Sequence, residues 1–223
     1  PRSMTSNSVD AGGALPPKRP RGRPRKSVDE RDDGNRRKAL LAAAAKLFRR
    51  KGFAATTTRD IAGAAGMQSG SPFYHFKNKE ALLYAVMESG MHHALQRQSA
   101  VVQSSAYAQL SAAQQLHALV RMHFEILLGP GNDFVPVMLY ESRSLPPRQR
   151  KALAELIAAY EATWLPVLER LHQQGLLRAP VRLARLLMLG ALNWSVQWFD
   201  AKKGADLAPL TDAAVALFLK ESE

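Results

Sequence analysis

The stretch from Thr57 to Glu80 limits the possible folds more than any other part of the chain. Thr57 precedes Asp60 by three residues, a spacing typical of a capping box at the start of a helix. Gly66 follows a small apolar face, and glycine readily takes the left-handed conformation that ends a helix. The pattern therefore predicts one short helix that begins after Thr57 and ends in a tight turn at Gly66.

A second short helix is expected directly after this turn. Ser69 is a suitable N-cap, and it would place Pro72 at the third helical position, where a missing N–H breaks no intrahelical hydrogen bond. Phe73 and Phe76 are three residues apart, so we expect both to anchor the helix to the core. A short polar helix beside a basic rim is what a helix-turn-helix inserts into the major groove. The residues left facing solvent would be Ser69, Gly70, Tyr74, Lys77 and Lys79.

One run of letters resembles the recognition-helix signature of the TetR family of bacterial transcriptional regulators: G-M-Q-S-G-S-P-F-Y-H-F-K-N-K-E, at residues 66–80. The preceding run, A-L-L-A-A-A-A-K-L-F-R-R-K-G-F-A-A-T-T-T-R-D-I-A, resembles the family's first two helices, so the likeness covers residues 37–85. Pro72 departs from the usual Leu or Ile, and Phe73 departs from the usual Tyr, whose hydroxyl reaches a phosphate in the family. The resemblance implies an all-α fold, with an N-terminal three-helix helix-turn-helix domain and a C-terminal helical domain for ligand binding and dimerisation.

We expect individual side chains of the recognition segment to have separate roles on DNA. Phosphates would be held by Thr58, His75, Lys77 and Lys79, which set the register on the duplex. Base edges or a thymine methyl would be read by Arg59, Gln68, Ser69, Ser71 and Tyr74, with Gly70 close to the DNA.

Charge and composition agree with a nucleic-acid partner. The 223 residues carry a net charge of +12, which favours an acidic partner such as nucleic acid or an anionic membrane. No apolar run reaches the roughly 18 residues that a transmembrane helix needs, so a membrane partner is not expected. The absence of cysteine fits a reducing compartment, and we expect a cytoplasmic protein.

Residues 1–35 form a basic tail that is too poor in apolar residues to build a core, and we expect it to be disordered. Its segment Lys18–Lys26 contains P-R-G-R-P, which resembles an AT-hook. Arg21 and Arg23 would then reach along a narrow A·T-rich minor groove. The alternative is a solvated basic tail with nonspecific affinity for phosphate.

Apolar periodicity and breaker residues divide the rest of the chain into helices. The DNA-binding domain is expected at residues 36–82 and the ligand-binding and dimerisation domain at 83–223. Pro166 should kink the longest helix of the second domain. The predicted helices outside the recognition segment span 33–51, 78–102, 107–128, 133–144, 147–174, 180–200 and 209–221.

The last two helices are unusually apolar for the end of a chain. Burial within the monomer would explain this, but TetR-like proteins pair their last two long helices with those of a second copy. We therefore expect a homodimer. Its interface would be formed by Leu183, Leu187, Gly190, Ala191, Trp198, Leu210, Ala214, Leu217 and Phe218.

The middle helices could enclose a pocket for a small hydrophobic effector, because the family usually holds an inducer here. The segment L-G-A-L-N-W-S-V-Q-W-F-D is similar to members linked to acyl-CoA or fatty-acid sensing. An aromatic stripe at helical spacing is equally typical of a core. The expected lining residues are His117, Arg121, Phe124, Met138, Tyr140, Tyr160, Trp164, Asn193, Trp194 and Gln197.

The sequence contains no nucleophile motif, phosphate loop or paired-carboxylate site, so we expect no enzyme activity and no cofactor. The histidine spacings do not predict a metal site, and His123 is expected to be a surface or core residue. Two functions remain, a ligand-responsive repressor and an architectural DNA-binding protein that senses nothing. A cavity of several hundred Å³ would favour the repressor, and a fully packed middle domain would favour the architectural protein.

Overall fold

The computed structural model describes residues 28–200 and 206–220, with the side chains of residues 28–32, Ser71 and Phe73 outside the description. The all-α fold is confirmed, because this part of the chain forms only helices, apart from one isolated bridge between Leu177 and Leu219. None of these helices is both long and apolar enough to cross a lipid bilayer. The tail with Arg21 and Arg23 lies outside the described residues.

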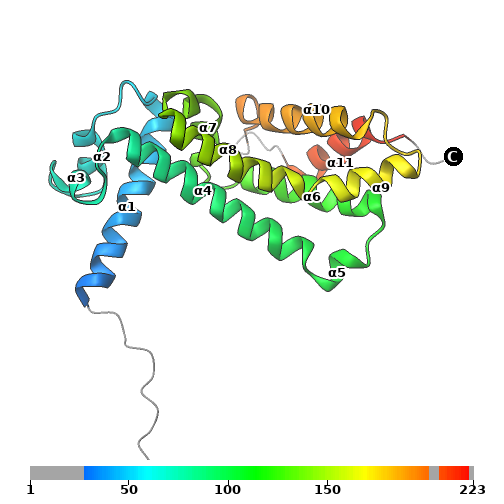
Figure 1. The fold of residues 1–223 in the computed structure, drawn as a ribbon, viewed down its shortest axis with the longest axis horizontal. Coiled ribbons are helices and arrows are strands. Elements are labelled where there is room, and N and C mark those ends of the chain that lie inside the picture. The colour runs from blue at the N-terminus through cyan, green and yellow to red at the C-terminus, as the bar shows by residue number, and fades with distance from the viewer. Residues whose placement is uncertain (1–27, 201–205, 221–223) are drawn as a thin grey trace, which may run out of the picture.

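The first four helices build the N-terminal unit at one end of the molecule (Figure 1). They are α1 (Val28–Lys51), α2 (Thr58–Ala64), α3 (Ser71–His75) and α4 (Lys79–Val102). α1 begins at Val28 rather than near Asp33, so the helix includes residues that we assigned to the tail. The acidic positions 29, 30, 32 and 33, which we expected to start the first helix, thus fall inside it near its N-terminus.

The remaining helices form the larger C-terminal unit, into which α4 continues. Proline and capping residues set the breaks: α8 ends before Pro166, which lies in the first turn of α9, and a capping box at Ser111 begins α6. The predicted single helix over 147–174, kinked at Pro166, is instead two helices, because α8 ends with Thr163 as its C-cap and Pro166 occupies the first turn of the next helix. The elements are α5 (Ser105–Ala108), α6 (Ala112–Leu128), α7 (Phe134–Glu141), η1 (Ser142–Ser144), α8 (Pro147–Ala162), α9 (Leu165–Gln173), α10 (Val181–Trp194), η2 (Ser195–Gln197) and α11 (Leu207–Phe218).

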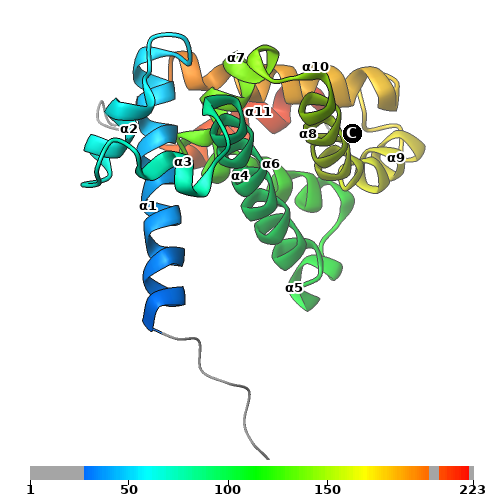
Figure 2. The same ribbon diagram turned by 60° about the vertical axis from the view of Figure 1, so that its left-hand side comes forward.

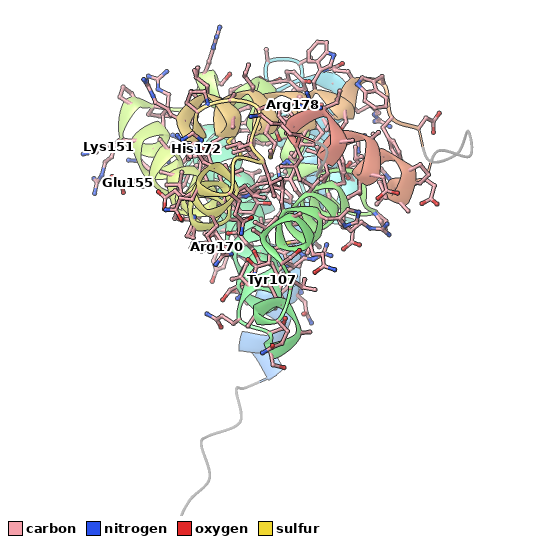
Figure 3. All side chains as sticks on the ribbon, turned by 90° about the vertical axis from the view of Figure 1, so that its right-hand side faces the viewer. Tyr107, Lys151, Glu155, Arg170, His172 and Arg178 are labelled. Atoms are coloured by element: carbon pink, nitrogen blue, oxygen red, sulfur yellow. The ribbon has the colours of Figure 1, made fainter. Side chains whose placement is uncertain are left out.

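α6 is the central helix of this unit, because it packs against α4, α9, α10 and α11. Its buried stripe includes Leu116, Leu119 and Phe124, which join one continuous apolar core with the first unit. At the end remote from α3, Arg170 of α9 donates to Gln115 of α6, and Gln115 donates to the carbonyl of Tyr107 (Figure 3). This end is therefore held by polar contacts between three elements.

α7 connects the two units (Figure 2). At its N-terminal end, Arg49 of α1 donates to Asp133 at 2.7 Å. At its C-terminal end, Glu141 accepts a hydrogen bond at 2.9 Å from the backbone N–H of Phe53, just after α1. The short helix is thus attached to the DNA-binding unit at both ends.

Candidate DNA-binding surface and effector cavity

The turn between α2 and α3 has the geometry that the sequence predicts. Thr57 and Asp60 form a reciprocal capping box, with both hydrogen bonds at 3.1 Å. Gly66 has φ of +69°, and its N–H donates to the carbonyl of Gly63 while that of Met67 donates to Ala62. These two bonds are the Schellman pattern that satisfies the last carbonyls of a helix.

α3 begins later than predicted. Gly70 is its N-cap in place of Ser69, and Pro72 therefore occupies the second helical position. The proline still lies in the first turn, where its missing N–H costs no helical hydrogen bond. Ser69 remains in the turn, exposed to solvent.

The α2–α3 segment presents an exposed polar surface. Among the large hydrophobic residues that the structure describes, Tyr74 is the most exposed, at 83%, although aromatic rings are usually buried. Arg59 and Gln68 are exposed as well, as are Gly70 and Lys77, and Thr58 is half-buried. Their contacts with DNA remain predictions, but their exposure leaves them available for such contacts.

Lys79 has a role that the sequence did not reveal. Its ammonium group donates to the carbonyls of Phe53 at 2.8 Å, Thr56 at 2.9 Å and Ala54 at 3.5 Å, and it lies 4.3 Å from the centre of the Phe53 ring. A lysine has three N–H donors, and all three are used here. Lys79 therefore holds the connection between α1 and α2 in place, and the phosphate contact that we expected of it stays a prediction.

His75 is also placed differently from the prediction. Only 8% of its side chain is exposed, and its Nδ1 lies 3.7 Å from a carboxylate oxygen of Asp33 in α1. The ring packs between those of Tyr74 and Phe76. In this structure His75 therefore packs between α3 and α1, and its contact with a phosphate stays a prediction. The sequence pattern could not show this, because it gives no information on how α1 crosses α3.

A cavity of about 60 Å³ lies between α4, α6, α7, α8 and α10. Three of the residues predicted for an effector pocket, Met138, Tyr160 and Asn193, line it, and their contact with an effector stays a prediction. The volume is below the several hundred Å³ that we set for a sensor. The remaining lining is mostly apolar and is formed by Met91, Ala94, His123, Ile126, Leu127, Phe134, Val135, Ile157, Glu161 and Leu189.

His123 of α6 is the polar centre of the cavity wall. Its Nδ1 lies 2.9 Å from the hydroxyl of Tyr160, and its Nε2 lies 3.1 Å from the side-chain oxygen of Asn193. Burial lowers the pKa of His123 to about 4, although the hydrogen bond to Asn193 opposes the shift, and burial raises the pKa of Tyr160. The ring is therefore neutral at pH 7, and with Nε2–H donating to Asn193, Nδ1 accepts from Tyr160.

The burial of His123 could have been predicted from its position along α6. It continues the buried stripe of Leu116, Val120 and Leu127, so a titratable ring lies among apolar side chains. A second missed contact joins the cavity wall to α10, because Arg185 donates to Glu161 of α8. Together with the His123–Asn193 bond, it connects two cavity-lining helices to α10.

The other residues predicted for an effector pocket lie outside the lining of this cavity. His117 pairs with Asp212 at 2.7 Å, and Arg121 pairs with Glu125 at 3.0 Å. Both ends of these pairs are partly exposed, because residues 117 and 121 lie on a different face of α6 from His123. Phe124 and Trp164 are buried in the core outside the cavity lining. Tyr140, Trp194 and Gln197 are exposed, and Gln197 donates to the hydroxyl of Tyr140.

α10 carries an exposed apolar face, defined as Leu183, Leu186, Leu187, Trp194 and Trp198, the last just beyond the helix. Gly190 and Ala191 lie within it and are exposed, and Leu217 of α11 is 72% exposed. Leu210 and Phe218 are half-buried, and Ala214 is buried within the monomer, where α11 packs on α6. Ala214 therefore contributes to the core of the monomer, and the predicted interface stays a prediction.

Comparison with known proteins agrees with this architecture. The family described as bacterial regulatory proteins, tetR family, matches residues 40–86, and the family described as tetracyclin repressor-like, C-terminal domain, matches residues 109–221. The HTH-type transcriptional repressor KstR2 of Rhodococcus jostii (strain RHA1) is 30% identical over 174 residues, which are 77% of this chain and 83% of that protein.

Two solved structures extend the comparison. The superantigen PfiT is 36% identical, with a TM-score of 0.68, and the match covers 84% of this chain and 97% of PfiT. AibR in complex with isovaleryl coenzyme A and operator DNA has a TM-score of 0.71 at 24% identity, with 82% and 97% covered, and so shares the fold. The chain belongs to the TetR family of bacterial regulatory proteins, and it carries the family's helix-turn-helix domain.

Proposed function

We propose that this protein is a ligand-responsive transcriptional repressor that releases its operator when it binds a small hydrophobic effector of the acyl or fatty-acid type. The exposed Arg59, Gln68 and Tyr74 carry the DNA-binding part of the proposal, because a free polar surface on a short helix is what a major groove receives. Similarity of the whole fold carries less weight, since PfiT, described as a superantigen, has the same fold.

Two copies are proposed to bind DNA together through the exposed apolar face of α10. Five large apolar side chains in solvent are unusual for a monomer, and pairing would remove them from water. A two-fold pair would also present two α3 helices to successive major grooves, about one DNA turn apart.

The effector part rests on the cavity and on its connection to α1. Phe134, Val135 and Met138 of α7 line the cavity, while the ends of α7 hold Arg49 and the backbone of Phe53. A ligand larger than the cavity would displace α7 and, through these contacts, change the position of the DNA-binding unit. Such a ligand favours one conformation by differential binding and thereby weakens the complex with DNA. AibR, which was crystallised with isovaleryl coenzyme A and operator DNA, supports the choice of an acyl compound.

The test is operator binding measured by fluorescence anisotropy, on a DNA site selected with the purified protein. Addition of hexanoyl-CoA is expected to raise the apparent Kd for DNA. In the double variant Asp133→Ala, Glu141→Ala, DNA binding should persist while the response to the ligand falls, because α7 then has no side-chain acceptor for Arg49 or for the N–H of Phe53. Glu169→Ala, on the exposed surface of α9, is the matched control. Operator affinity that no acyl compound changes would favour the architectural DNA-binding protein instead.

A further inference from the structure

Within the described part of the chain, Phe134 is the residue that the cavity shares with a second hollow of the molecule. This hollow is a groove of about 360 Å³ between α1, α4 and the loop before α7, with Lys38, Ala42, Ser89, His93 and Asn132 in its lining. α1 belongs to the DNA-binding unit, so one wall of the groove is part of that unit. The groove is six times larger in volume than the cavity and lies directly beyond the Phe134 ring.

The ring of Phe134 lies against the backbone of α4 at Gly90. A Cβ atom at position 90 would lie 2.0 Å from Cδ2, 2.1 Å from Cγ and 2.6 Å from Cε2 of the ring. These distances are far shorter than any normal carbon contact. The ring therefore occupies the space that any other residue at position 90 would need, and glycine is required for this arrangement.

The local structure allows the ring to leave this place. Phe134 is the first residue of α7 and follows the loop Gly129-Pro130-Gly131, in which Gly131 has φ of +78°. No side chain caps the N-terminus of α7. Because the Phe134 side chain is purely apolar, its rotation breaks no hydrogen bond.

We propose that Phe134 is a movable partition within a two-part effector site, in which the cavity takes the apolar end of an amphiphilic anion and the groove takes its anionic head. The inference rests on the proposed function of the cavity. Lys38 and His93 line the groove, and its lining contains no carboxylate. The cavity holds roughly four water-sized spheres, which suits a short chain of about five carbons. The head would touch α1 directly and so act on the DNA-binding unit.

The chain contains no cysteine, so one introduced thiol reports on access to the cavity. Ala94 of α4 is buried and lines the cavity, and Ala94→Cys adds only one sulfur atom there. We expect slow reaction with iodoacetamide in this variant. Adding Phe134→Ala or Gly90→Ala, which removes or displaces the ring, should raise the rate roughly tenfold or more, because the barrier to local access is gone.

A second thiol controls for general loosening of the fold. Ser195 is buried and lies outside the cavity lining, and Ser195→Cys conserves its shape. Its reaction rate should be unchanged by Phe134→Ala, and thermal unfolding shows whether each variant is folded. Phe134→Leu, which keeps much of the side-chain volume, should give an intermediate rate at position 94. A rate at position 94 that is independent of residue 134, or one that rises equally at position 195, overturns the partition.

Three probes test the anionic head: 1-hexanol, hexanoate and hexanoyl-CoA, which share one chain length. Hexanoate or hexanoyl-CoA should protect the thiol at position 94 better than hexanol, and comparison of the two separates a carboxylate head from a phosphate-bearing one. Lys38→Gln should reduce this protection several-fold. Lys46→Gln, an exposed lysine of α1 outside the groove, should leave it unchanged. Equal protection by hexanol and both anions overturns the two-part site.

DNA binding of the Ala94→Cys protein is measured in parallel, so that the two proposals fail separately. Protection by the anions without any operator binding would remove the repressor function and leave the two-part site standing. Operator binding that responds to hexanoyl-CoA, with a thiol at position 94 that no anion protects, would remove the two-part site alone.

Discussion

The buried His123 predicts a specific loss of stability in acid. Its pKa is about 4 in the folded protein, whereas an exposed histidine, as in the unfolded chain, has a pKa of 6.5. Between pH 4 and pH 6.5 the unfolded chain therefore binds a proton that the folded protein does not bind. The free energy of unfolding therefore falls as the pH drops below 6.5, and the loss is complete below about 4. The difference between the two pKa values corresponds to about 3 kcal/mol in total, of which about 2 kcal/mol is lost between pH 7 and pH 5.

Urea unfolding at pH 7, 6 and 5 measures this loss. Carboxylates also take up protons in acid, so the wild-type protein must be compared with His123→Gln, which lacks the titrating ring. The variant is expected to be less stable at pH 7, because Tyr160 and Asn193 lose their partner, but its stability should fall by about 2 kcal/mol less on going to pH 5. His93→Gln removes an exposed ring and should keep the wild-type pH dependence. If wild type and His123→Gln lose the same stability between pH 7 and pH 5, the buried neutral histidine is refuted.

Three further predictions concern other parts of the molecule. Lys79→Met should lower the free energy of unfolding by about 1–3 kcal/mol, since three carbonyls lose a charged donor, whereas Lys77→Met should change it little; equal urea midpoints would show that Lys79 does not hold the loop. Gly190→Arg should give a monomer in analytical ultracentrifugation, while Ala100→Arg on the exposed surface of α4 should not. A Cβ atom added at position 190 would meet nothing within 4 Å in the monomer, so the substitution should leave the monomer fold intact. A dimer that persists in Gly190→Arg contradicts the α10 interface. Deletion of residues 1–30 should weaken binding to A·T-flanked operators more than to G·C-flanked ones in anisotropy titrations, and equal losses would contradict the AT-hook reading.

Local features were the ones that the sequence could predict. The capping box at Thr57 and the left-handed Gly66 depend only on neighbouring residues, and both were found as predicted. Pro166 does interrupt the predicted helix 147–174, but as a boundary between α8 and α9 rather than as a kink within one helix. The late start of α3 escaped prediction because Ser69 and Gly70 can both precede a helix. Capping preference alone does not decide between them.

Contacts between distant segments were the ones that could not be predicted. Lysine and histidine are residue types that often contact DNA, so the sequence alone suggested this role for Lys79 and His75. Only the fold shows that Lys79 donates to three backbone carbonyls and that His75 lies beside Asp33. The residues that line the cavity could not be predicted for the same reason. A helical stripe shows which residues share a face of a helix, but not which neighbouring helix covers that face. The burial of His123 could have been predicted, because its position on the buried stripe of α6 follows from residue spacing alone.

Selection of bound sequences from random double-stranded DNA tests the central claim most directly, namely that α2 and α3 read an operator. The purified wild-type protein is expected to enrich a two-fold symmetric site whose half-sites are about one helical turn apart. Arg59→Ala should enrich the same site with one base position relaxed in each half, at a cost of about 1–3 kcal/mol on the wild-type operator. Enrichment of no common sequence, or an unchanged site with Arg59→Ala, would contradict the account.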